Sequence, residues 1–170
     1  FREKNEDFIY PCGNQERIFV LCDGMGGHGH GEIASEIVGT SVFRYLKELQ
    51  IDEYTPDVLQ EALDFAVEQL NNADTYHDER RMGTTLVVVA LNRYNVLVGH
   101  VGDSRCYLLD NCCNIKFRTR DHSMVAEAVE NQILTEEEAY NSPKKNILTR
   151  SVQAGKDEKN EMTIDTLVDV

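Results

Sequence analysis

The stretch that decides the fold reads Arg-Ile-Phe-Val-Leu-Cys at residues 17–22 and continues as Asp-Gly-Met-Gly-Gly-His-Gly-His-Gly-Glu at residues 23–32. A short apolar run that ends in Asp-Gly predicts a largely buried strand ending at Asp23. Apolar residues then recur at helical spacing from Ile33 to Leu49, so a helix is expected directly after the glycine-rich turn.

Asp23 and its turn form a candidate cation site. A carboxylate at the end of a buried strand is costly without a partner, and the glycines leave backbone carbonyls open to a ligand. Oxygen donors of this kind suit a hard ion such as Mg²⁺ or Mn²⁺.

Other interpretations of the same turn have less support. An ordinary Asp-Gly turn needs one glycine, whereas this segment has several. A phosphate-binding loop would show G-x-x-x-x-G-K-[ST], and the charge of Asp23 would repel the phosphate. His28 and His30 have no cysteine or third histidine at the spacing of a zinc site.

The rest of the chain predicts helices, then strands, then helices again. Thr55-Pro56-Asp57 is typical of a helix start, and the apolar stripe that follows predicts a helix to about residue 72. Successive strands with turn-forming residues between them predict hairpins, and they lie at residues 86–91, 96–101, 105–109 and 114–118. Ser123 and Thr135 predict caps of two short helices, the second ended by Pro143. Since strands and helices do not alternate, the fold class is α+β with antiparallel sheets.

Composition narrows the classes of partner and compartment. The 170 residues are about one domain's length, and 30 Asp and Glu against 17 Lys and Arg give a net charge of −13. That charge argues against binding to nucleic acids or anionic membranes. The five cysteines include no C-x-x-C pair and suggest neither a disulfide framework nor a zinc site. Without a membrane span or an apolar leader, the cytoplasm is the expected compartment.

Five motifs occur in a characteristic order: residues 2–7 (Arg-Glu-Lys-Asn-Glu-Asp), 23–27, 83–86 (Gly-Thr-Thr-Leu), 101–105 (Val-Gly-Asp-Ser-Arg) and 119–123 (Thr-Arg-Asp-His-Ser). In order and spacing they resemble the bacterial branch of the PPM (type 2C) serine/threonine protein phosphatases. The resemblance covers essentially residues 1–170 as one domain. It implies two antiparallel sheets packed as a sandwich, flanked by helices, with a metal centre at one end. The family's last two metal-binding aspartates would lie beyond Val170, so the chain resembles the first two-thirds of such a domain, truncated at its C-terminus.

The resemblance also implies roles for individual residues. Asp23 would bridge two catalytic cations, Mn²⁺ or Mg²⁺, and Arg2 would grip the substrate phosphate. The implied metal ligands are Glu6, Asp7, Asp23, the carbonyl of Gly24, and Asp103, which would hold a third, weaker ion. A metal-activated water would then hydrolyse phosphoserine or phosphothreonine in a phosphorylated protein substrate. Met25 stands where many eukaryotic members have a histidine proposed as general acid.

An alternative from another class stays open, because a truncated or pseudo-phosphatase module would bind cations or a partner protein without turnover. Missing closing strands would leave sheet edges exposed, so self-association is also expected. Parts of three motifs have structural interpretations: Gly83-Thr84-Thr85 allows close strand packing, Arg105 pairs with a carboxylate, and Asp121-His122-Ser123 starts a helix. Outside the motifs, His100 is interpreted as packed or hydrogen-bonded inside a strand.

Overall fold

The computed structural model describes residues 5–10, 16–25, 30–74, 82–155 and 160–168. Its main sheet is antiparallel, with the strand order β8-β3-β2-β4-β5-β9, and β1 pairs with the other edge of β2. The strands of this sheet are β1 (Asp7–Tyr10), β2 (Ile18–Met25), β3 (Gly83–Thr84), β4 (Leu86–Leu91), β5 (Asn95–Val101), β8 (Val152–Gln153) and β9 (Thr163–Val168). A second sheet consists of β6 (Tyr107–Leu109) and β7 (Ile115–Arg118).

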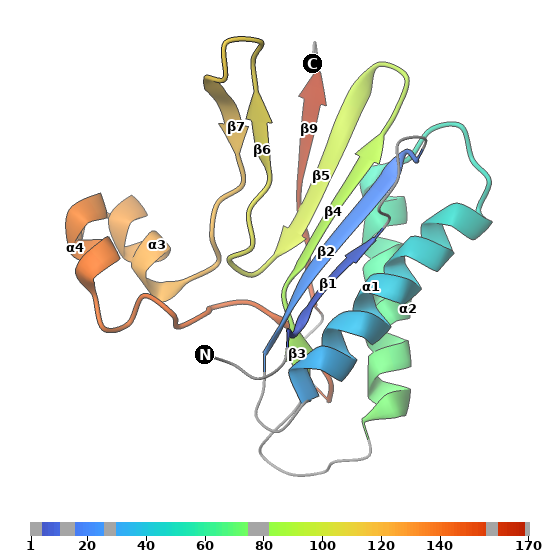
Figure 1. Cartoon of the computed structure of the whole chain (residues 1–170), viewed down its shortest axis with the longest axis horizontal. Coiled ribbons are helices and arrows are strands. Elements are labelled where there is room, and N and C mark those ends of the chain that lie inside the picture. Colours follow the sequence, from blue (N-terminus) through green and yellow to red (C-terminus); the bar gives the residue numbers. More distant parts are fainter. Residues whose placement is uncertain (1–4, 11–15, 26–29, 75–81, 156–159, 169–170) are drawn as a thin grey trace.

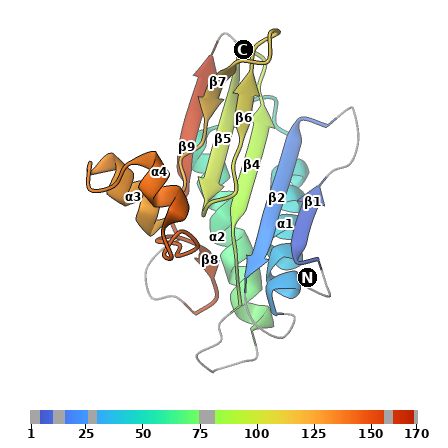
Figure 2. The same ribbon diagram turned by 60° about the vertical axis from the view of Figure 1, so that its left-hand side comes forward.

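The helices and the small sheet lie on opposite faces of the main sheet. Helices α1 (His30–Glu48) and α2 (Pro56–Ala73) cover one face, and the β6–β7 hairpin stands over the other (Figures 1 and 2). The short helices α3 (Met124–Glu130) and α4 (Glu136–Asn141) pack together beside the sheet. This α+β arrangement confirms the predicted fold class.

Side-chain alternation along β2 decides which residues face the helices. Ile18, Val20 and Cys22 are 3%, 2% and 0% exposed and belong to the core under α1. Because successive side chains of a strand point to opposite faces, Asp23 points away from the helices. The predicted strand therefore delivers its terminal carboxylate to the sheet face opposite α1 and α2.

The apolar stripe of α1 completes this core. Val38, Val42 and Leu46 recur at helical spacing and are each 0% exposed. Gly39 lets the helix approach β1, because an added Cβ there would lie 2.2 Å from the ring of Phe8. The expected amphipathic helix is confirmed, and it starts a few residues earlier than its first apolar residue.

One predicted strand pairing is wrong. The second expected hairpin would pair residues 96–101 with residues 105–109, but β6 pairs with β7, and the free edge of β5 is occupied by β9. The chain leaves the sheet at Gly102, whose φ of 108° is in the region that favours glycine. β1, β3 and β8 have no counterpart among the predicted strands, since four, two and two residues are too few for a pattern.

The helix caps follow the sequence signals. Thr55, Ser123 and Thr135 each accept a hydrogen bond from a backbone N–H in the first turn, and Thr135 forms a full capping box with Glu138. None of the helices in the described ranges is long and apolar enough for a membrane span. The cysteines that the structure describes are free.

Replacing Thr55 with alanine should lower the free energy of unfolding by about 0.5–2 kcal/mol, since the Val58 N–H loses the hydroxyl that caps α2. Equilibrium denaturation in urea measures the change. Thr55→Ser keeps the hydroxyl and should restore most of the stability. Equal losses of unfolding free energy in both variants would show that the lost stability does not come from the cap.

Candidate metal centre

Asp7 and Asp23 face each other across the β1–β2 pair. They are directly opposite in the antiparallel register, so their side chains leave the same face of the sheet. Cβ atoms of such partners are about 4.5–5.5 Å apart. Two carboxylates therefore start side by side at the end of the sheet, which would be unfavourable without a cation between or beside them.

Threonine side chains fix the end of β2. The backbone N–H of Asp23 donates to Oγ1 of Thr85 at 2.9 Å, and its carbonyl accepts from the Thr85 N–H at 2.9 Å and from Oγ1 of Thr84 at 3.0 Å. The position of the Asp23 carboxylate thus depends on Thr84 of β3 and on Thr85, which lies between β3 and β4. The structural interpretation of Thr84 is confirmed.

Gly24 lies against the start of α1. Its N–H donates to the carbonyl of Glu6 at 3.0 Å, and that carbonyl also accepts from Oγ of Ser35 at 2.6 Å. An added Cβ at Gly24 would lie 2.1 Å from the carbonyl oxygen of Gly31, which no side chain can occupy. Close helix packing therefore requires this glycine, in addition to any access it gives to a ligand.

A cavity of about 670 Å³ opens beside this strand end. Asp23, Gly24 and Thr85 line one side, and Asp103 and residues of the 146–153 segment line the rest. Oγ of Ser104 lies 2.8 Å from Oγ1 of Thr85, which connects the turn that carries Asp103 to the end of β2. The tertiary structure therefore brings two of the predicted acidic motifs to one cavity, although 80 residues separate them in the chain.

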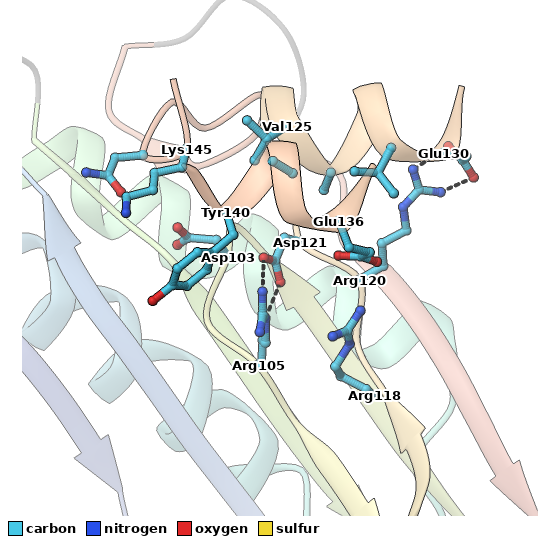
Figure 3. Close-up of a pocket in the computed structure, with 14 residues that line it drawn as sticks. Asp103, Arg105, Arg118, Arg120, Asp121, Val125, Glu130, Glu136, Tyr140 and Lys145 are labelled. Carbon is cyan, nitrogen blue, oxygen red and sulfur yellow. Dashed lines mark hydrogen bonds and ion pairs between the residues drawn. The ribbon is translucent and has the colours of Figure 1, made fainter. Parts of the chain in front are cut away.

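Burial raises the pKa of the Asp103 carboxyl above its ordinary value, and the charge of Asp121 acts in the same direction. Asp103 also lines a second cavity of about 630 Å³, which lies between the base of the β6–β7 hairpin and helices α3 and α4 (Figure 3). There Arg105 forms a bidentate ion pair with Asp121 at 2.6 and 2.7 Å, which raises the pKa of the guanidinium. The predicted carboxylate partner of Arg105 is confirmed.

The five implied ligands are not all gathered in one cluster. Asp7, Asp23, Gly24 and Asp103 belong to the strand pair and the cavity, whereas the Glu6 carboxyl carbon lies beside Gly31 at the start of α1. Among the residues that the structure describes, no three His, Cys, Asp or Glu side chains are grouped closely enough to hold a metal ion. Arg2 and His28 lie outside the described residues.

The donors that are present nevertheless fit a hard cation. The cavity offers carboxylate and hydroxyl oxygens and includes no histidine or cysteine side chain among its described lining residues. Carboxylate and hydroxyl oxygens favour Mg²⁺, Mn²⁺ or Ca²⁺ over zinc or copper. The described residues therefore supply part of a cation site of the predicted kind.

Two residues near the site had no functional role in the sequence analysis. Thr85 connects Asp23 to the Asp103 turn, and His122 was interpreted only as part of a helix start. The His122 ring stacks on buried His100 with centroids 4.6 Å apart. Burial, followed by His100 and nearby arginines, lowers the pKa of His122 to about 4. Contacts across the fold, which leave no local pattern, gave both residues their positions.

Comparison with known proteins places these features in a family. Residues 3–156 match the family model described as protein phosphatase 2C. A putative protein phosphatase 2C-type of Streptococcus pyogenes is 36% identical over 155 residues, which cover 89% of this chain and 63% of the relative. The serine/threonine phosphatase stp of Listeria innocua is 34% identical over 158 residues, which cover 89% and 62%.

Solved structures agree. The S. agalactiae serine/threonine phosphatase superimposes with a TM-score of 0.85 at 33% identity, covering 99% of this chain and 70% of that chain. The catalytic domain of PstP in complex with two manganese ions gives a TM-score of 0.79 at 27% identity, covering 98% and 68%. The chain thus spans under two-thirds of the length of the curated relatives above. With its fold, its acidic cavity and these matches taken together, the chain belongs to the bacterial branch of the protein phosphatase 2C family.

Proposed function

We propose that this chain contributes most of the active site of a protein phosphatase that hydrolyses phosphoserine and phosphothreonine with Mn²⁺ or Mg²⁺. The observation that carries the proposal is that Asp7 pairs in register with Asp23, which lines the same cavity as Asp103. Support comes from the relative named serine/threonine phosphatase stp and from the PstP structure with two manganese ions.

In this proposal the chain's own residues hold the cations and orient the substrate. Asp7, Asp23, the Gly24 carbonyl and Asp103 would provide oxygen ligands. Glu6, which precedes β1 and whose carboxyl carbon lies beside Gly31, would support them. Bound divalent ions supply an acidified water and offset the charge of the phosphate. Thr84 and Thr85 keep the Asp23 backbone fixed.

Arg2 would bind the phosphate of the substrate. A guanidinium presents two parallel N–H donors to phosphate oxygens, so it both neutralises charge and fixes orientation. The protein substrate would approach a chain with a net charge of −13, so the cations and Arg2 also reduce repulsion of the phosphorylated segment.

A second candidate is a module that binds cations or a partner protein but has no turnover. The form that binds a partner protein is favoured by one observation, that the described residues contain no group of three metal-binding side chains. Self-association through β1, β8 and β9, the outer strands of the sheet in the described part of the chain, remains a prediction in either case. Ile9 and Phe19, which are 58% and 36% exposed, are consistent with such contacts.

We expect the protein expressed from its whole reading frame to hydrolyse an aryl phosphate and a phosphothreonine peptide only when Mn²⁺ or Mg²⁺ is present. Initial rates are measured with each ion, with excess chelator, and after the ion is restored. Turnover that survives chelation would contradict the proposal. Cation binding without any turnover would favour the module without catalysis.

A further inference from the structure

His122 contacts both backbone polar groups of Gly102, the residue before Asp103. The N–H of Gly102 donates to Nδ1 of the His122 ring at 3.1 Å, and the carbonyl of Gly102 accepts from the His122 backbone N–H at 2.9 Å. Gly102 has a φ of 108° and packs against Thr85, where an added Cβ would lie 2.6 Å from Cγ2. His122 therefore pairs with both backbone polar groups of a glycine that has an unusual backbone conformation and directly precedes a candidate ligand.

These contacts determine the tautomer of the His122 ring. A backbone N–H is always a donor, so Nδ1 must present its lone pair, and the proton of the neutral imidazole lies on Nε2. Nε2 lies 3.0 Å from Oγ1 of Thr163, to which it donates. Arg150 also donates to the same hydroxyl oxygen, at 3.3 Å.

The same residue connects three parts of the chain at the cavity. Its ring contacts the Gly102 turn and, through Thr163, the start of β9, while its carbonyl accepts from the N–H of Thr149 at 2.9 Å. Thr149 belongs to the 146–153 segment, several residues of which line the cavity beside Asp23. The stacked ring of His100, itself 1% exposed and within hydrogen-bonding distance of the Arg120 carbonyl, leaves little room for rotation of His122.

We propose that His122, as its Nε2–H tautomer, is a positioning residue that clamps Gly102 and thereby holds the carboxylate of Asp103 at the cavity. Its effect on cations rests on the proposed function, in which Asp103 is a ligand. The clamp itself rests only on the hydrogen bonds and can be tested without activity.

The first test locates the proton on the His122 ring directly. Long-range ¹H–¹⁵N correlation spectra of the ¹⁵N-labelled protein at neutral pH, recorded with Mg²⁺, should show the His122 proton on Nε2 and a bare Nδ1. A proton on Nδ1, or a doubly protonated ring, would overturn the clamp.

The second test uses two substitutions, each of which keeps a polar group at one of the two nitrogen positions of the imidazole. In His122→Asn the amide oxygen replaces Nδ1 and still accepts from Gly102, whereas in His122→Gln the amide reaches toward Thr163 and no acceptor is left for Gly102. Hydrogen-exchange protection of the Gly102 amide should fall about tenfold in His122→Gln and stay within about twofold in His122→Asn, as expected for loss of one hydrogen bond. Equal effects in both variants would contradict the assigned contact.

The third test asks whether the clamp acts through Asp103. Mn²⁺ affinity, read from the electron paramagnetic resonance signal of free Mn²⁺, should weaken about three- to tenfold in His122→Gln. The same substitution should have no further effect in an Asp103→Asn background, since coupled residues are not additive. A full effect in that background would mean that His122 supports general stability and does not position Asp103.

The two proposals fail in distinguishable ways. If the parent protein binds no Mn²⁺, the proposed function is overturned, while the ring proton and the Gly102 protection still decide the clamp. If Mn²⁺ binding depends on Asp103 but His122→Gln leaves the Mn²⁺ affinity unchanged, the positioning role is overturned and the proposed function stands.

Discussion

Asp23→Asn should lower metal-dependent turnover of an aryl phosphate by more than about a hundredfold, because even partners of metal ligands contribute about 10- to 100-fold. Asparagine keeps the shape and the backbone hydrogen bonds to Thr84 and Thr85 but removes the charge next to Asp7. The loss should come with weaker Mn²⁺ binding and little change in thermal stability. Steady-state kinetics across a range of Mn²⁺ concentrations measures the effect.

Asp165→Asn is the matched control. Asp165 lies on β9, at the other edge of the same sheet, and pairs with Val98 of β5. The substitution of aspartate by asparagine is the same as at Asp23. Its turnover should stay within about twofold of the parent, as for substitutions away from a site. A similar loss in both variants would indicate a general response to charge, and an active Asp23→Asn protein would remove the basis of the metal centre.

Gly24→Ala should destabilise the protein by about 1–3 kcal/mol or more, the usual range for a methyl group forced into a packed region. The new Cβ would meet the Gly31 carbonyl at 2.1 Å and the Glu6 carbonyl at 2.7 Å. Both contacts are backbone atoms, so β2 and the start of α1 must separate. Because Asp23 precedes this position, Mn²⁺ affinity should fall as well. Urea denaturation and Mn²⁺ titration of one preparation measure both effects.

Gly83→Ala serves as the comparison for the same substitution in the strand next to β2. Its Cβ would meet side-chain atoms of Gln153 and Met25 at 3.2 and 3.3 Å, and such atoms can move by a few tenths of an ångström. We expect a change in unfolding free energy below about 1 kcal/mol, since volume changes that neighbours absorb cost little. If Gly24→Ala were equally mild, the close approach of α1 would not matter for the site.

The catalytic assignment depends on where the two strand ends meet. A carboxylate pair in register is a feature of the sheet. The register places Asp7 opposite Asp23 because Phe8 packs against the core beside Cys22 and the ring of Tyr10 packs against that of Phe43 on α1. A slip of one residue would turn Asp7 toward the helices and expose the aromatic rings. Core packing therefore fixes the geometry of the acidic pair.

The sequence by itself determined the elements whose signals are local. The apolar run before Asp23, the stripe of α1 and the caps at Thr55, Ser123 and Thr135 each depend on residues a few positions apart, so they could be predicted from periodicity and hydrogen-bonding chemistry. The ordered motifs also named the candidate ligands, but only through their resemblance to the phosphatase family.

Only the tertiary structure decided which of those residues meet. β9 reaches the edge of β5 from more than 60 residues away, the 146–153 segment closes the cavity, and His122 clamps the turn before Asp103. Such contacts join positions far apart in the chain, and each depends on the free energy of packing the whole core. No short window of sequence carries that information, whereas a cap or an amphipathic stripe is complete within one turn or one helix.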